Sequence, residues 1–155
     1  MGLRISRAVL GDILRHVAAT PDHEACGLLF GDADHIRAAA PAANVSDRPA
    51  AAFEIDPAAL FAAMRAERAG GPPVIGHYHS HPSGDAMPSP RDAAAAADPG
   101  RLWLIVADGR AACFRAERGG PIHDAFRAVP LDAAGDAGCI ADAAPPERPP
   151  PPAPR

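Results

Sequence analysis

The chain contains no lysine: all fifteen of its basic residues are arginines, and nineteen acidic residues give it a formal net charge of −4 at pH 7. Proteins that bind nucleic acid or an anionic membrane surface carry a basic patch, which this balance does not favour. No apolar run is long enough to span a membrane, and the N-terminus lacks the basic and apolar regions of a signal peptide. We therefore predict a cytoplasmic protein with neither nucleic acid nor a membrane as its partner.

Cysteine is scarce as well, with three residues that lie far apart in the sequence: Cys26, Cys113 and Cys139. No two of them form the C-x-x-C pair that is typical of zinc ribbons and dithiol redox proteins. The sequence therefore predicts reduced thiols. Cys26 and Cys113 lie in apolar runs and are expected to be small buried residues.

The hydrophobic pattern predicts one domain of mixed secondary structure. A chain of 155 residues, 48% of them hydrophobic, suits a single core. Apolar residues at helical spacing, each series preceded by an N-cap residue, predict helices that begin at Ser6, Asp56 and Ser89 and end near Ala19, Gly70 and Ala97. Short apolar or alternating runs predict strands at 26–31, 35–40, 74–79, 102–106, 111–116 and, at an edge, 122–129.

The end of the chain has a different composition. Seven of the last eleven residues are proline, and such a segment cannot build a core. We predict a folded domain over residues 1–140 and a disordered, partly polyproline tail over 141–155.

One histidine-rich stretch offers the residues of a metal site. His79 and His81 are two positions apart in a predicted strand, so their side chains point to the same face. Asp92 would supply a third ligand if the Pro/Gly-rich segment before it turns the chain back. Imidazoles and a carboxylate suit zinc, and three protein ligands leave a position for water, as in catalytic zinc sites. His77 shares this face, and the pattern favours a histidine beside the site over a fourth ligand.

Two further residues are candidates for catalysis. Ser89 and Asp92 form the S-x-x-D signature of a helix N-cap, and the same serine could donate its hydroxyl to developing negative charge. Glu24 immediately precedes a predicted strand. It is either an exposed loop residue or the base that a hydrolytic zinc site needs to move a proton.

Together these residues resemble the JAMM/MPN+ metallopeptidases in their bacterial single-domain form. The family's metal-binding pattern, H-x-H-x7-S-x-x-D, is matched at every defined position between His79 and Asp92. A second pattern, E-x-C-G-L-L-x-G, is matched by residues 24–31, and the family's middle segment is similar to residues 44–46 and 53–57.

The resemblance covers about residues 1–128 and implies a curved mixed β-sheet flanked by helices, an α/β (α+β) fold like that of cytidine deaminases. It implies one zinc ion held by His79, His81 and Asp92, with Glu24 as general acid/base and Ser89 stabilising the oxyanion. The implied activity is hydrolysis of a peptide or isopeptide bond at the C-terminal Gly-Gly end of a ubiquitin-like or sulfur-carrier protein. No insertion long enough for a ubiquitin-gripping loop is apparent, which argues against polyubiquitin.

Two other functions are compatible with parts of the sequence. Residues 81–85 also resemble the RadC family, which is linked to DNA repair, although the acidic balance and the lack of a helix-hairpin-helix region argue against a DNA-associated module. A non-catalytic MPN scaffold is the second alternative, although such subunits lose metal-binding positions that are all kept here. The sequence does not predict an oligomeric state.

Overall fold

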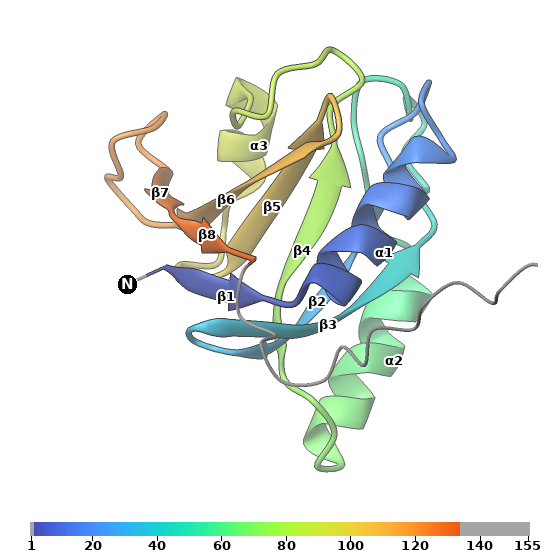
Figure 1. Cartoon of the computed structure of the whole chain (residues 1–155), viewed down its shortest axis with the longest axis vertical. Coiled ribbons are helices and arrows are strands. Elements are labelled where there is room, and N and C mark those ends of the chain that lie inside the picture. The colour runs from blue at the N-terminus through green and yellow to red at the C-terminus, as the bar shows by residue number, and fades with distance from the viewer. Residues whose placement is uncertain (1, 134–155) are drawn as a thin grey trace, which may run out of the picture.

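A computed structural model of the chain describes residues 2–133, so Cys139 and the tail predicted over 141–155 lie outside the described residues. Within the described residues, one mixed sheet has the strand order β7-β6-β5-β4-β2-β3-β1-β8 (Figure 1). The strands are β1 (Leu3–Ile5), β2 (Cys26–Asp32), β3 (His35–Ala42), β4 (Val74–Ser80), β5 (Leu102–Ala107), β6 (Arg110–Ala116), β7 (Phe126–Val129) and β8 (Leu131–Asp132). The helices are α1 (Arg7–Ala18), α2 (Pro57–Arg68) and α3 (Pro90–Ala95). None of these helices combines the length and the apolar character needed to cross a membrane.

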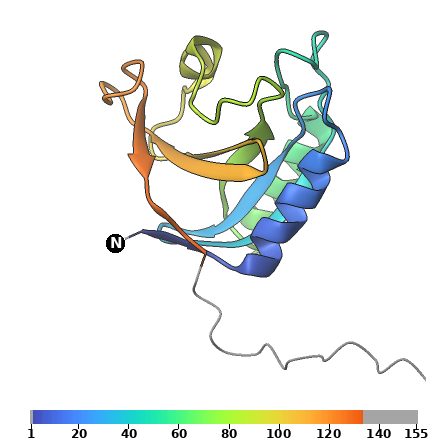
Figure 2. The same cartoon turned by 45° about the horizontal axis from the view of Figure 1, so that its top comes forward.

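The sheet is strongly curved, and consecutive segments of chain form its two edges. β7 and β8 are separated only by Pro130, yet β7 pairs with β6 at one end of the strand order and β8 pairs with β1 at the other. Figure 2 shows how the sheet curls to bring these edges together. The sequence did not predict β1 and β8, because strands of three and two residues are too short to show an alternating pattern. The predicted fold class, a curved mixed sheet flanked by helices, is confirmed.

Some predicted boundaries are wrong, and β3 runs two residues past its predicted end at Ala40. The strand predicted over 122–129 is extended only from Phe126 onwards, because residues 122–125 form a tight turn in which His123 and Asp124 have positive φ angles of 52° and 58°. Left-handed backbone of this kind ends a strand. The third helix ends at Ala95, two residues before the predicted end at Ala97.

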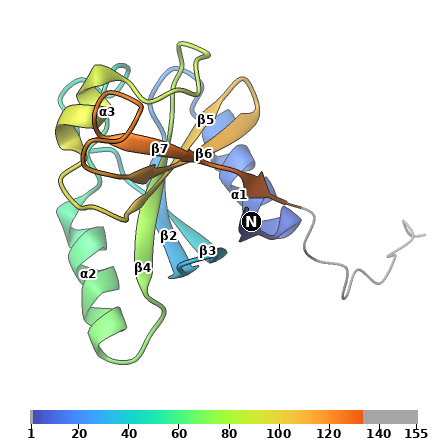
Figure 3. The same ribbon diagram turned by 90° about the vertical axis from the view of Figure 1, so that its left-hand side faces the viewer.

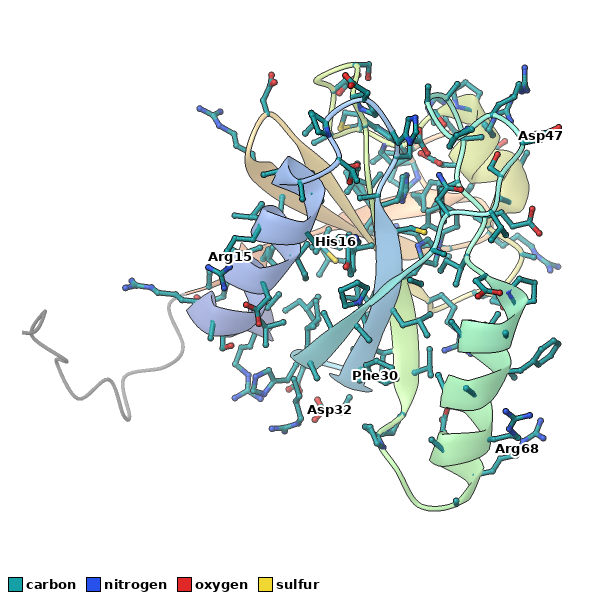
Figure 4. All side chains as sticks on the ribbon, turned by 90° about the vertical axis from the view of Figure 1, so that its right-hand side faces the viewer. Arg15, His16, Phe30, Asp32, Asp47 and Arg68 are labelled. Carbon is teal, nitrogen blue, oxygen red and sulfur yellow. The ribbon has the colours of Figure 1, made fainter. Side chains whose placement is uncertain are left out.

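The helices cover opposite faces of the sheet. α1 lies on one face, and α2 and α3 lie on the other (Figure 3). The side chains of β4 alternate between these faces: Tyr78 points towards α1, where its hydroxyl lies 2.6 Å from Nδ1 of His16, which points inward from α1 (Figure 4). His77 and His79 therefore point towards α2 and α3. Gly27 on β2 permits this packing, because a Cβ atom there would lie 2.3 Å from the Tyr78 ring.

The connection between β4 and β5 returns the chain over the face that carries the histidines. These two strands pair in parallel. Consecutive parallel strands need a long crossover, because the chain must return to the end of the sheet at which both strands begin. α3 is part of that crossover. Ser89, the N-cap residue of α3, and Asp92 in its first turn are thereby placed close to the end of β4.

Candidate metal centre

The two histidines and the aspartate of the predicted metal site meet in a buried cluster. Nε2 of His79 and Nε2 of His81 lie 3.0 Å apart, and they lie 3.3 and 3.2 Å from the two carboxylate oxygens of Asp92. All three side chains are buried. Within the described residues, no other group of three or more histidine, cysteine or acidic side chains is arranged to hold a metal ion. The three side chains that the spacing singled out therefore do come together.

The orientation of His81 leaves Nε2 free to bind a metal. Its Nδ1 lies 2.7 Å from the backbone carbonyl oxygen of Asp85. A carbonyl only accepts hydrogen bonds, so Nδ1 carries the proton and donates it. In the neutral ring Nε2 then has a free lone pair, which is the usual arrangement behind a metal-binding histidine. No sequence pattern indicates this role of Asp85, because the contact is made by the backbone.

Nδ1 of His79 has no hydrogen-bond partner within the described residues, and aromatic rings hold this side of the side chain. The ring of Phe53 stacks on it, with centroids 4.2 Å apart and an interplanar angle of 18°, and Trp103 meets it edge-on at 5.8 Å. Burial lowers the pKa of His79, which favours the neutral, metal-binding form. Sequence reasoning missed Phe53 and Trp103 as part of the site, because they come from a loop and from a neighbouring strand.

Asp92 is fixed by a reciprocal N-cap at the start of α3. The Asp92 N–H donates to Oγ of Ser89 at 3.1 Å, and the Ser89 N–H donates to Oδ2 of Asp92 at 2.9 Å. Burial would raise the pKa of Asp92, but hydrogen bonds to His79 and His81 outweigh it and hold the pKa well below its usual range. Asp92 is therefore an anion, as a metal-binding carboxylate must be.

Glu24 reaches the cluster from the start of β2. In the antiparallel pairing of β2 with β4, Cys26 is opposite His79, and the Ser80 N–H donates to the Ala25 carbonyl at 3.0 Å. One more step in this register places Glu24 opposite His81. Oγ of Ser80 accepts a hydrogen bond from the Ala25 N–H at 2.8 Å, which holds the segment that carries Glu24 against the end of β4.

The side chain of Glu24 is buried, and the alternative of an exposed loop glutamate is therefore wrong. Burial raises its pKa to about 7, and Asp92 adds to this effect, while His81 and Arg91 oppose it. Within the described residues its carboxylate accepts no hydrogen bond, which leaves it free for a water molecule or a substrate. A carboxylate with a pKa near neutrality is suited to accept and return a proton.

One cavity of about 400 Å³ opens to the solvent, and it is lined by Glu24, Ser89 and Asp92. Its other walls come from residues 51–55, the first turns of α2, His77 and Trp103. The loop over residues 43–52, in which Asp47 lies, overhangs the end of the sheet opposite to the end of α2 at Arg68 (Figure 4). His79 and His81 contact Asp92, so all five predicted site residues lie at or next to this cavity.

His77 lies beside the cluster, as the sequence favoured. Its ring contacts Trp103, with centroids 4.2 Å apart, and it is 6.0 Å from the ring of His79. Burial, which is the largest effect, lowers the pKa of His77 to about 3. A neutral histidine that packs on aromatic rings is part of the cavity wall rather than a fourth ligand.

The donor set fits one zinc ion. Tetrahedral zinc binds imidazole nitrogen and carboxylate oxygen at about 2.0–2.2 Å, so two ligand atoms lie about 3.3 Å from each other. The two imidazole nitrogens lie 3.0 Å apart, and each lies 3.2 or 3.3 Å from a different oxygen of the Asp92 carboxylate. Three ligands from the protein would leave a fourth position for water or substrate, which distinguishes a catalytic zinc site from a structural one.

The sequence matches a known domain family and named relatives. Residues 6–118 match the prokaryotic homologs of the JAB domain. The desampylase of Haloferax volcanii is 38% identical over 106 residues, which are 66% of this chain and 76% of that protein. A probable TtuB-protein conjugate cleaving protease of Thermus thermophilus is 36% identical over 90 residues, 58% of this chain and 60% of that protein, so the match spans less than two thirds of this second relative.

Solved structures share the fold. A protein of Desulfitobacterium hafniense superposes with a TM-score of 0.70 at 26% identity, over 84% of this chain and 92% of that protein. A JAB1/MPN domain protein of Archaeoglobus fulgidus gives a TM-score of 0.51 at 21% identity, over 84% and 96% of the two chains. The curled sheet and its three helices are therefore the arrangement that JAB/MPN domains adopt.

Proposed function

The chain belongs to the family of prokaryotic homologs of the JAB domain and is a JAMM-type metal-dependent hydrolase, and we propose that it cleaves the peptide or isopeptide bond after the C-terminal Gly-Gly of a ubiquitin-like or sulfur-carrier protein. The observation that carries this proposal is the buried cluster of His79, His81 and Asp92, whose aspartate lines the same cavity as Glu24. The similarity to a desampylase and to a probable TtuB-protein conjugate cleaving protease supports this class of substrate.

In this proposal His79, His81 and Asp92 hold one zinc ion. Zinc with three protein ligands supplies a Lewis acid and lowers the pKa of water towards neutrality. In the metal-free protein, burial lowers the pKa of His81, but Asp92 and the carbonyl of Asp85 outweigh it and raise the pKa. Binding of a cation therefore displaces a proton from this site.

Glu24 carries the proton through the reaction. Its carboxylate takes a proton from the attacking water, whose oxygen forms a bond to the substrate carbonyl carbon. Glu24 then gives the proton to the departing amine as the C–N bond breaks. The hydroxyl of Ser89 accepts a hydrogen bond from the Asp92 N–H, so its own proton is free to be donated to the oxyanion that forms on the substrate.

The substrate tail is proposed to lie along the segment that contains Phe53 and Ile55. The backbone of Glu54, between these two residues, is already paired with the preceding loop. Its C=O accepts a hydrogen bond from the Val45 N–H, and its N–H donates to the side-chain oxygen of Asn44. Within the described residues no hydrogen bond is recorded for the backbone of Phe53 or Ile55, which line the cavity. An extended peptide can pair with these free groups as an added strand. The edges of the main sheet, β7 and β8, are remote from β4 in the strand order, so they do not serve this purpose.

The proposal is tested with a small Gly-Gly-terminated sulfur carrier extended by one cysteine, by a short peptide or by an isopeptide-linked lysine. The zinc-loaded protein is incubated with each substrate, and intact masses are followed. We expect release of the group after the second glycine, loss of this activity with a chelator and its return with zinc. If one zinc is bound and all three substrates stay intact, the proposed substrate class is wrong.

The same protein serves to test the alternatives. A DNA-associated module would bind plain duplex DNA in a salt-dependent way, and we expect no such binding. A scaffold without catalysis would leave every substrate intact. We place the reaction in the cytoplasm, which is supported by the free, buried thiols of Cys26 and Cys113.

The role of Ser89 gives a separate prediction. Replacing Ser89 with glycine is expected to lower kcat by about 10²–10³-fold, the usual effect of removing one oxyanion donor. Glycine is tolerated as an N-cap at a cost of a few tenths of a kcal/mol, whereas alanine costs about 1 kcal/mol. Rates and thermal melting of Ser89→Gly and Ser89→Ala therefore separate catalysis from capping. Equal rates for Ser89→Gly and the unaltered protein would refute the oxyanion role.

A further inference from the structure

The turn between β6 and β7 carries an unusual backbone conformation next to α3. His123 and Asp124 are consecutive residues, neither of them glycine, and both have left-handed φ angles. Such a conformation persists only where the surrounding structure holds it in place, and it is most frequent at functional sites. The turn is held by the backbone, since the Gly119 N–H donates to the Asp124 carbonyl and the Ile122 N–H donates to the Phe126 carbonyl.

This conformation aims the ring of His123 at the peptide group that precedes α3. Nε2 of His123 lies 3.0 Å from the carbonyl oxygen of Pro88. Because a carbonyl only accepts, Nε2 donates the hydrogen bond. The same peptide group, on its other side, carries the Ser89 N–H, which donates to Oδ2 of Asp92 at 2.9 Å. One peptide plane therefore joins the His123 ring to the carboxylate of Asp92.

The turn and α3 pack against one apolar cluster through small side chains, among them Ala93 and Ala125, and a cavity also lies between them. This cavity has a volume of about 250 Å³, with the small side chains of Ala93, Ala96 and Ala97 on one wall and residues 116–118 and 123–125 on the other. Within residues 2–133, the His123–Pro88 bond is the only recorded hydrogen bond between residues 117–125 and residues 82–95. This bond is thus the one hydrogen bond by which the turn reaches the peptide before α3.

We propose that His123 is a positioning residue of the metal centre, which acts through the Pro88–Ser89 peptide to orient the carboxylate of Asp92. The proposal rests on the function proposed above, in which Asp92 binds the metal. Donation to the Pro88 carbonyl polarises the peptide and strengthens the bond that its N–H makes to Asp92. Partners that orient a metal-binding carboxylate in this way affect metal affinity by 10–100-fold when they are lost.

The loss of the contact is tested with His123→Asn. Asparagine tolerates the left-handed backbone, but its side chain is too short to reach the Pro88 carbonyl in the same way. We expect its zinc dissociation constant, measured by chelator competition, to rise by about 10–100-fold. We expect kcat to fall while KM stays within about twofold, because the substrate-binding surface is unchanged. His123→Gln keeps an N–H donor at a similar reach and is expected to restore most of the zinc affinity.

Asp124→Gly is the matched control for backbone strain. Glycine adopts positive φ at no steric cost, and the side chain of Asp124 makes no recorded contact with α3. We expect zinc affinity and kcat of this variant to equal those of the unaltered protein. A merely structural role of the turn would instead lower the melting temperature of the metal-free His123→Asn protein and leave its zinc affinity unchanged.

A measurement without metal separates this proposal from the function on which it rests. In the metal-free protein, the amide of Ser89 is expected to exchange its hydrogen roughly fivefold faster in His123→Asn, because its hydrogen bond to Asp92 weakens. If Ser89 exchange and zinc affinity are both unaltered in this variant, the positioning role is wrong. If Ser89 exchange responds but the unaltered protein binds no zinc, the function proposed for the site fails, and the contact itself stands.

Discussion

Replacing Glu24 with glutamine is expected to lower kcat by about 10²–10⁴-fold, the range that general acid–base catalysis contributes, and to leave one zinc ion bound per chain. Glutamine has the same shape as glutamate but cannot accept and return the proton. Glu24 lies outside the cluster of His79, His81 and Asp92, so metal binding does not depend on it. Turnover is measured by intact mass and zinc content by elemental analysis.

Glu54→Gln is the matched control for this variant. Glu54 lines the same cavity, but its side chain is exposed at the rim. We expect its removal to change kcat by at most about threefold, because an exposed charge contributes little in water. A similar loss of rate in both variants would show that the cavity needs negative charge in general. Full activity of Glu24→Gln would refute its role as the base.

The raised pKa of Glu24 also predicts a pH-dependent stability in the metal-free protein. Burial raises the pKa from 4.5 to about 7, so the folded protein holds the proton more tightly than the unfolded chain. The resulting stabilisation is complete below pH 4.5 and is lost as the pH rises through 7. Relative to Glu24→Gln, the unaltered metal-free protein should therefore lose stability between pH 4.5 and 7.5, measured by urea denaturation.

Replacing Asp92 with asparagine is expected to weaken zinc binding by at least about 100-fold and to abolish turnover. Loss of a residue that only supports a ligand already costs 10–100-fold, and Asp92 is proposed as a ligand itself. Its carboxylate is the only acidic group among the three cluster residues, so the variant removes the negative charge of the cluster. Chelator competition gives the zinc dissociation constant, and the conjugate assay gives the rate.

Asp92 belongs to the metal cluster and also caps α3, so two different substitutions at this position distinguish metal binding from folding. The side-chain oxygen of asparagine still accepts the hydrogen bond of the Ser89 N–H, so the metal-free Asp92→Asn protein should keep the cap of α3. Asp92→Ala removes that acceptor and should be about 1 kcal/mol less stable. Asp47→Asn, in the exposed loop shown in Figure 4, is the control for charge alone. Tight zinc binding by Asp92→Asn would refute its assignment as a ligand.

The regular geometry of strands and helix starts made several features predictable from local sequence. Two histidines at i and i+2 share a face of a strand wherever that strand lies, and S-x-x-D describes a helix start whose bonds span only three residues. For this reason the predicted caps at Ser6, Asp56 and Ser89 are all confirmed. The resemblance to a family then assigned Asp92 and Glu24 to the same site, which no local pattern could do.

The sequence alone determined the candidate donor atoms of the metal centre and the starts of the three helices, because these depend on neighbouring residues. The tertiary structure decided what surrounds them. The register between β2 and β4 buried Glu24 and so raised its pKa. The crossover through α3 brought Asp92 to the histidines, and the turn at His123 reached the peptide before α3. These contacts join residues that are far apart in the chain, and their positions follow from strand pairing and packing rather than from any local pattern.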